Sequence, residues 1–191
     1  MYEVELKLPA DHDALGPRLE AAGSFRGDVR QADTYYDAPH RSFAETDEAL
    51  RLRRETREAS TETRLTYKGP LVEVESKTRP EYETALENAE AAARILDALG
   101  YSPVATVEKE RSLYAVEGYT VALDRVAGLG ESLEVERDAD EGSMTAVREG
   151  AYDVCRSLGL DPTDQLRTSY LGLLLDADGR PGDGATDPSG G

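Results

Sequence analysis

Charged and aliphatic residues alternate strictly in the first strand-like segment of the chain. Glu3, Glu5 and Lys7 occupy every second position there, and aliphatic residues fill the positions between them. Because strand side chains point to opposite faces with period two, this segment would place two carboxylates and an ammonium on one face and the aliphatics on the other. A single such segment is also typical of an ordinary antiparallel strand with one solvated face. The recurrence of the pattern therefore matters more than its first appearance.

The same alternation returns often enough to predict at least seven strands, and their charged positions carry both signs. The basic positions are Lys7, Arg51, Arg53, Lys68, Arg79, Lys109 and Arg111. The acidic positions are Glu3, Glu5, Glu81, Glu83, Asp124, Glu134 and Glu136. Between the strands, the polar segment 55–61 is predicted to be a hairpin loop, and residues 31–39 are predicted to form a strand ending in a turn.

Three other segments have helical periodicity and capping signals. They cover residues 11–22, 88–99 and 143–158. Asn88 can cap the second of these helices, and Gly100 can end it. In the first, Pro17 favours a late start, because proline is tolerated mainly in the first turn of a helix.

Two geometries accommodate strands with one charged face. In the first, the sheet is curved or sandwiched over its aliphatic side, and the charges face water. In the second, the strands close into a barrel whose lumen holds the charges, while the aliphatic side chains face outward. The helices favour the barrel, because amphipathic helices need an apolar surface to pack against and the outer face would supply it. A barrel of about eight strands leaves room for side chains or one small ligand.

The mixture of charges indicates the ligand of such a lumen. Cations alone would predict an anion site, but the carboxylates suggest a divalent metal as well, since Mg²⁺ prefers oxygen ligands and often binds through one or two carboxylates and substrate phosphates. Arginine can contact phosphate with two parallel hydrogen bonds, and lysine supplies a point charge. The combination fits a polyphosphate that is bridged to a metal.

The overall charge of the chain argues against a nucleic-acid surface. Its net charge is −17, whereas phosphate backbones are bound by clustered lysine and arginine. Lysine is scarce, and the four lysines are Lys7, Lys68, Lys77 and Lys109. An acidic, lysine-poor surface suggests adaptation to high salt, where repulsion between surface acids is screened. The alternative is an ordinary acidic protein from a GC-rich genome.

Location and domain organisation follow from simpler observations. No apolar run is long enough to span a membrane, and no leader-like segment precedes the first strand, so we expect a cytoplasmic protein without a membrane partner. Cys155 is the only cysteine, and its helical context predicts a small core residue. Residues 1–175 are expected to form one domain, and the Gly-, Asp- and Pro-rich residues 176–191 a flexible acidic tail. A homodimer through the outer barrel face is compatible with this, although no patch identifies it.

The segments together resemble the CYTH superfamily, also called triphosphate tunnel metalloenzymes. The first strand matches the family's ExExK signature, and further matches follow in the family's order: DTYYD (33–37), TDEALRLR (46–53), TYKGP (66–70), KTRPEYE (77–83), EKER (108–111), ALDRV (122–126), GLGESLEVE (128–136) and TSY (168–170). The wording is most similar to class IV adenylyl cyclases and their archaeal relatives. The resemblance implies an α+β fold with a closed eight-stranded antiparallel barrel and helices packed outside.

The resemblance also implies roles for individual residues. Carried over by position, the metal candidates for Mg²⁺ or Mn²⁺ are Glu3, Glu5, Glu134 and Glu136, with Glu5 and Glu136 favoured. The candidates for binding the triphosphate are Lys7, Arg51, Arg53, Lys68, Arg79, Lys109 and Arg111. Glu5, Glu136, Lys7 and Asp124 are the catalytic candidates, and Asp124 would assist a metal or orient a base. Ser132 departs from the family pattern, in which an aromatic or larger apolar residue is common, so the packing beside a nucleobase stays open.

Three functions follow from the resemblance. A cyclase would convert ATP to cyclic AMP and pyrophosphate in the tunnel. A triphosphatase would use the same residues to orient water against tripolyphosphate, thiamine triphosphate or a nucleoside triphosphate. A non-catalytic module would bind a polyphosphate or nucleotide without turnover. The sequence favours the cyclase, with a nucleotide or polyphosphate as the substrate and no nucleic-acid partner.

Overall fold

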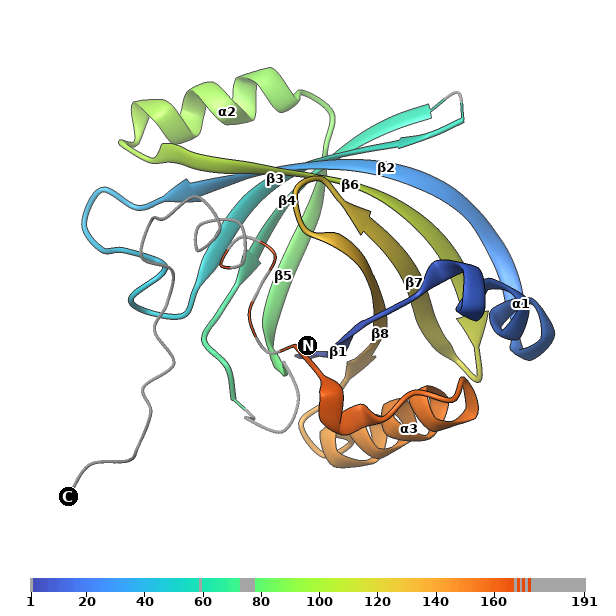
Figure 1. Ribbon diagram of the computed structural model, residues 1–191. Coiled ribbons are helices and arrows are strands. Elements are labelled where there is room, and N and C mark those ends of the chain that lie inside the picture. The colour runs from blue at the N-terminus through green and yellow to red at the C-terminus, as the bar shows by residue number, and fades with distance from the viewer. Residues whose placement is uncertain are drawn as a thin grey trace.

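Eight antiparallel strands close into a barrel in the computed structural model, which describes residues 2–58, 60–72, 78–166, 168, 170 and 172. Around the barrel the strand order is β1-β5-β4-β3-β2-β6-β7-β8 (Figure 1). The strands are β1 (Tyr2–Pro9), β2 (Ser24–Asp37), β3 (Ala49–Arg57), β4 (Ser60–Lys68), β5 (Arg79–Leu86), β6 (Ser102–Val116), β7 (Tyr119–Val126) and β8 (Gly130–Ala139). The barrel predicted from the recurring alternation is therefore confirmed.

The pairing of β1 closes the barrel and sets the positions of the acidic residues. Along one edge β1 pairs with β8 over its whole length, and along the other it pairs with β5 at Tyr2 and Glu3. In the β1–β8 register, Glu5 lies opposite Glu136. Like charges directly opposite each other destabilise a sheet unless other groups compensate them. The register therefore concentrates negative charge at this seam.

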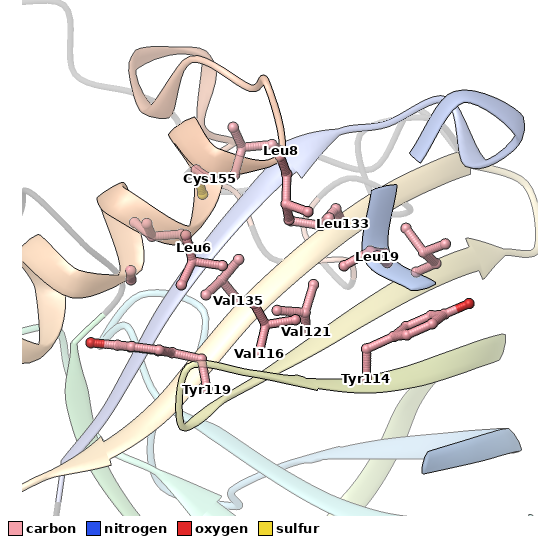
Figure 2. Packing of buried hydrophobic residues seen from close by; sticks show 14 of the residues in the cluster. Leu6, Leu8, Leu19, Tyr114, Val116, Tyr119, Val121, Leu133, Val135 and Cys155 are labelled. Carbon is pink, nitrogen blue, oxygen red and sulfur yellow. The ribbon is translucent and has the colours of Figure 1, made fainter. Parts of the chain in front are cut away.

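The outer face of the barrel is aliphatic and forms the main core of the molecule (Figure 2). Leu6 from β1, Val135 from β8 and Val121 from β7 are fully buried there against the helices. The helix residues Leu19 and Cys155 pack into the same cluster. Since alternate residues of each strand face this core, the charged residues between them must face the lumen. The prediction that Cys155 is a core residue is confirmed, and burial raises the pKa of its thiol to about 11.

Between residues 2 and 166, the described parts of the chain form three α-helices outside the barrel, with α2 across the molecule from α3 (Figure 1). They are α1 (His12–Ala22), α2 (Ala89–Ala98) and α3 (Met144–Ser157), and a short 3-10 helix, η1 (Pro162–Asp164), follows. Asn88 caps α2, and Gly100 follows it with a φ of 86°, a conformation that glycine adopts without strain. None of the helices in these described ranges is long and apolar enough to cross a membrane.

Three predictions of element boundaries were wrong. α1 begins at His12, capped by Asp11, so Pro17 lies inside the helix rather than near its start. This is tolerated because the carbonyl that Pro17 leaves without its donor belongs to the exposed Asp13, where water can satisfy it. The hairpin predicted at segment 55–61 is present, but its loop is shorter than predicted, because β3 and β4 stay paired as far as Arg57 and Ser60. β2 begins at Ser24, well before the predicted strand, because it pairs along its length with the long strand β6. The predicted tail, residues 176–191, lies outside the described residues.

Candidate active site in the barrel lumen

Five strands bring the predicted basic residues to one lumen. Lys7 comes from β1, Lys68 from β4 and Arg79 from β5, while β3 and β6 each contribute two residues. The basic side chains least exposed to solvent are Lys7, Arg51, Arg53, Lys109 and Arg111, which are all buried. An unpaired buried charge is costly, so each of these cations needs a partner inside the barrel or a ligand. The acidic residues of the lumen supply the first kind of partner.

Arg111 is the most fully paired cation of the lumen. Its Nε and Nη2 atoms donate to the two carboxylate oxygens of Asp124 at 2.7 and 2.6 Å, and Nη2 also contacts Glu134. Asp124 is completely buried and is also contacted by Lys109, whose Nζ lies 3.5 Å from Oδ2. This geometry favours a positioning role for Asp124, because its carboxylate is occupied in orienting Arg111.

Asp33 plays the corresponding role for β3 and was not among the predicted site residues. Its carboxylate accepts two hydrogen bonds from Arg53, at 2.7 and 2.6 Å, and lies 3.6 Å from Nη1 of Arg51. Burial alone would raise the pKa of Asp33, but these two arginines outweigh it and hold the pKa well below its usual range. The signal was present in the DTYYD segment, but the alternation placed no partner opposite it.

Lys68 lies between two carboxylates. It contacts Glu3, and its Nζ lies 2.8 Å from Oε2 of Glu81. Burial, together with the charge of Glu3, raises the pKa of Glu81 despite the nearby ammonium. Glu81 was placed on a charged face by the sequence but was not predicted as a site residue. Arg51, whose Nη2 lies 3.9 Å from Glu81, supplies a second positive charge beside these carboxylates.

Arg79 is held by loops at the barrel end. Its guanidinium donates to the carbonyl of Gly69 at 3.3 Å and to the backbone carbonyl and side chain of Asp47 at 3.3 and 3.2 Å. Asp47 also accepts a hydrogen bond from the backbone of Leu71. Arg79 therefore links the loop that contains Asp47 to the loop that contains Gly69. Its contact with a triphosphate stays a prediction.

Three buried cations keep donors available for a ligand. Nε of Arg51 finds no hydrogen-bond acceptor among the described residues, while Nη1 lies 3.6 Å from Asp33 and Nη2 lies 3.9 Å from Glu81. Nζ of Lys7 lies 3.3 Å from Glu134 and 3.9 Å from Glu5, and Nζ of Lys109 lies 3.5 Å from Asp124 and 4.0 Å from Glu134. Burial and the charge of Arg111 lower the pKa of Lys109. These loosely paired cations are the natural partners of an incoming anion.

Tyr170 reaches the lumen from the segment after α3. Its hydroxyl donates to Asp124 at 2.9 Å and lies 2.6 Å from the hydroxyl of Ser132, while Nζ of Lys7 lies 3.4 Å from the ring centroid. The TSY segment was part of the family resemblance, but nothing in the sequence placed this ring in the tunnel. The resemblance places an aromatic or larger apolar residue at position 132, where this chain has Ser132. The aromatic ring beside Ser132 comes instead from Tyr170.

The acidic seam between β1 and β8 fits a divalent cation by its chemistry. Burial raises the pKa of Glu136, and the negative charges of Glu3, Glu134 and Glu5 raise it further against the effect of Arg111. A cation would relieve this repulsion, and carboxylate oxygens are the ligands that Mg²⁺ prefers. Within the described ranges, three acidic, histidine or cysteine side chains do not already converge on one point. Glu3 contacts Lys68 and Glu134 contacts Arg111, and the preference for Glu5 and Glu136 as metal ligands stays a prediction.

Comparison with known proteins gives consistent matches over nearly the whole chain. The model of the CYTH domain family matches residues 1–170. A Methanocaldococcus jannaschii protein, named as a candidate adenylate cyclase, is 35% identical over 176 residues, which are 91% of this chain and 98% of the relative. The adenylate cyclase CyaB of Aeromonas hydrophila is 30% identical over 176 residues, covering 90% of this chain and 88% of the relative.

Solved structures show the same fold. The PH1819 protein of Pyrococcus horikoshii superposes with a TM-score of 0.86 at 37% identity, covering 92% of this chain and 99% of the other. A Hippeastrum protein, described as a candidate adenylyl cyclase with a dominant triphosphatase activity, superposes with a TM-score of 0.61 at 20% identity, covering 94% of this chain and 96% of the other. The second likeness concerns the fold alone.

Proposed function

Because this chain belongs to the CYTH domain family, we propose that it is a metal-dependent enzyme that acts on a triphosphate bound in the barrel lumen. The preferred reaction is that of a class IV adenylyl cyclase, which converts ATP to cyclic AMP and pyrophosphate. Two relatives that cover about the full length of the chain are named for this activity, which supports the choice. The observation that carries the proposal is a set of buried cations enclosed by a barrel and only partly neutralised.

Substrate binding rests on the cations whose donors are available. Arg51, Lys7 and Lys109 would contact the phosphate oxygens, because each is buried and, among the described residues, their shortest ion pairs are 3.6, 3.3 and 3.5 Å long. Arg53 and Arg111 are already oriented by Asp33 and Asp124, so they supply a fixed positive potential. In phosphoryl chemistry such positioning and charge stabilisation account for most of the catalysis.

The acidic seam would hold Mg²⁺ or Mn²⁺, with Glu5 and Glu136 as the principal ligands and Glu3 and Glu134 beside them. When bound, a divalent ion supplies Lewis-acid polarisation of phosphate oxygens and makes a nearby hydroxyl more acidic. The residues of the chain hold the triphosphate in line for attack. In the cyclase, the ribose 3′-oxygen forms a bond to the α-phosphorus, the bond from that phosphorus to the bridging oxygen breaks, pyrophosphate leaves, and the hydroxyl proton passes to solvent.

Hydrolysis of a triphosphate is the alternative reaction of the same lumen. Water would then attack the γ-phosphorus of tripolyphosphate, thiamine triphosphate or a nucleoside triphosphate. The bond from that phosphorus to its bridging oxygen would break, the diphosphate part would leave, and the attacked phosphoryl group would become orthophosphate. The same cations serve both reactions, so the difference lies in whether a ribose hydroxyl or water is presented. A module that binds polyphosphate or nucleotide without turnover is the second alternative.

The deciding experiment compares products from ATP and from tripolyphosphate. The protein is incubated with each in Mg²⁺ or Mn²⁺ at high KCl, and the products are separated by chromatography. Cyclic AMP with pyrophosphate is the expected result from ATP. Orthophosphate without cyclic nucleotide would replace the cyclase by a triphosphatase, and saturable binding without turnover would leave only the binding module.

A pair of variants on β3 tests whether the lumen is the site. Arg51→Gln removes a buried cation with an unpaired donor, whereas Arg57→Gln removes an exposed arginine of the same strand. We expect Arg51→Gln to raise KM for the triphosphate at least about tenfold, since charge-assisted hydrogen bonds contribute about 1.5–3 kcal/mol each. Arg57→Gln should leave KM unchanged. Equal effects of the two variants would exclude the lumen as the binding site.

A further inference from the structure

Tyr170 is the one aromatic side chain that the described chain places against two ammonium groups of the lumen. Nζ of Lys7 lies 3.4 Å from its ring centroid, and Nζ of Lys109 lies 5.0 Å from it. Both distances are within the range in which a cation is attracted to the face of an aromatic ring. The ion pairs of the two lysines are long, since Nζ of Lys7 lies 3.3 Å from Glu134 and Nζ of Lys109 lies 3.5 Å from Asp124. The neutral ring therefore supplies part of the stabilisation of these buried cations that a carboxylate supplies for Arg111.

The kind of partner matters for binding an anion. A carboxylate that pairs with a buried cation must be displaced, or must repel the incoming phosphate, before the cation can be used. A ring stabilises the ammonium without adding negative charge to the lumen. Lys7 and Lys109 can thus stay buried, at 2% and 6% exposure, and still keep N–H groups for phosphate oxygens.

The tyrosine hydroxyl and the packing of the ring beside Val107 and Val126 together hold the ring in place. The tyrosine hydroxyl donates to Oδ2 of Asp124 at 2.9 Å, so the hydroxyl of Ser132, at 2.6 Å, must donate to the tyrosine oxygen. Burial and the charges of Glu134 and Asp124 raise the pKa of Tyr170, so the hydroxyl keeps the proton that it donates. The small side chain of Ser132 leaves space for the ring. Ser132 and Tyr170 therefore act as a matched pair.

A segment outside the barrel strands delivers this ring. The backbone N–H of Leu166, which follows η1, donates to the carbonyl of Lys7 at 2.6 Å and ties the segment to β1. Tyr170 then packs beside Val107 and Val126 at one end of the lumen. The eight strands alone would form the barrel without this part of the site.

We propose that Tyr170, held by Ser132, is a positioning residue of the triphosphate site, whose ring keeps Lys7 and Lys109 buried and available to phosphate. This inference rests on the proposed function, because it assigns the anion that the two lysines bind. Tyr170 touches the binding groups and not the reacting atoms. A purely structural role, in which the ring only fills space beside Val107 and Val126, is the alternative that a test must separate.

Two substitutions at position 170 separate the roles. Tyr170→Phe keeps the ring and loses the hydroxyl, whereas Tyr170→Leu keeps an apolar side chain that fills space and loses the ring. Tyr119→Leu is the matched control, because Tyr119 is equally buried, at 6% against 7%, and contacts the guanidinium of Arg137 but lies in the outer core. Binding of tripolyphosphate is measured by isothermal titration calorimetry with Ca²⁺ in place of Mg²⁺, and again in EDTA.

The expected order of affinities follows from the ring. We expect Tyr170→Leu to raise the Kd for tripolyphosphate about tenfold, because it removes the cation–π contacts of two desolvated ammonium groups. Tyr170→Phe keeps the ring, so its Kd should stay within about threefold of wild type. Tyr119→Leu should lower Tm without changing Kd. Equal Kd values for the leucine and phenylalanine variants would overturn the proposal.

The pairing with Ser132 supplies an independent test. Ser132→Leu removes the hydroxyl donor and fills the space of the ring, so it should weaken binding about as much as Tyr170→Leu, and the double variant should be no weaker than either. Additive losses would contradict the matched pair. If the wild-type protein binds no tripolyphosphate in either buffer, the proposed function fails and this inference with it, whereas wild-type binding with an unaffected Tyr170→Leu variant refutes the inference alone.

Discussion

Replacing Asp33 by asparagine tests how strongly the lumen depends on its internal ion pairs. Asp33 is 1% exposed and receives two hydrogen bonds from Arg53, while Arg51 lies 3.6 Å away. Asparagine has nearly the same shape but no charge and only one acceptor oxygen. The variant thus leaves two buried guanidinium groups facing a neutral amide.

The size of the effect follows from these contacts. Hydrogen bonds to charged groups contribute about 1.5–3 kcal/mol each, and breaking a buried ion pair by removing one partner costs about 3–5 kcal/mol. Because asparagine keeps one acceptor, we expect the free energy of unfolding at neutral pH to fall by about 3 kcal/mol, near the lower end of that range. A triphosphate should recover part of the loss, since it neutralises the arginines that Asp33 no longer pairs.

The pH dependence has a definite sign. The pKa of Asp33 is lowered in the folded protein, whereas the pKa of an aspartate in the unfolded chain is about 3.9. Its contribution is therefore fully present above the unfolded pKa and is lost as the pH falls through the folded pKa. We expect a constant difference between wild type and Asp33→Asn from about pH 5 to about pH 8, and a shrinking difference below about pH 4.

The assay is urea unfolding followed by circular dichroism at several pH values. Glu110→Gln is the control, because Glu110 pairs with Arg30 at 3.2 Å between β6 and β2, but both side chains are largely exposed. That variant should cost less than about 1 kcal/mol. A loss of less than about 1 kcal/mol in Asp33→Asn, or a difference that does not change down to about pH 3, would refute the reasoning.

Further predictions concern the acidic seam, the outer core and the net charge. Glu5→Gln and Glu136→Gln should each abolish metal-dependent turnover while leaving the circular dichroism spectrum unchanged; wild-type activity in either variant would remove that residue from the metal site. Gly150→Ala would place a Cβ atom 2.1 Å from Oη of Tyr119, so its Tm should reflect a loss of about 1–3 kcal/mol, and an unchanged Tm would mean that the tyrosine relaxes freely. Since the net charge is −17, Tm should rise between about 0.1 and about 2 M salt, equally in KCl and NaCl; a falling Tm would contradict adaptation to high salt.

The sequence determined the two-faced character of the strands. Glu3, Glu5 and Lys7 alternate with aliphatic residues, and a period of two allows only one assignment of these side chains to faces. A second local rule, helix capping, predicted the ends of α2 at Asn88 and Gly100, because capping depends on residues close in sequence. These features follow from the chain itself, since neighbours along it decide them.

The boundaries that failed were those set by distant partners. β2 extends back to Ser24 only because β6 runs alongside it. Residues 55–57 and 60–61 continue the ladder, because β3 and β4 stabilise each other beyond the point where the turn composition suggested a loop. Pairing energy gained from another strand overrides local propensity, and a single segment does not carry that information.

The tertiary structure alone decided which lumen charges are already paired. No sequence pattern distinguished Arg53 and Arg111, each bound by a buried aspartate, from Arg51, whose Nε has no hydrogen-bond partner in the described part of the chain. The sequence also did not predict the contact between Tyr170 and Lys7. That contact joins the two ends of the domain and depends on how the segment after α3 packs against the closed barrel. Alternation fixes a side chain's face, but closure of the sheet fixes its partner.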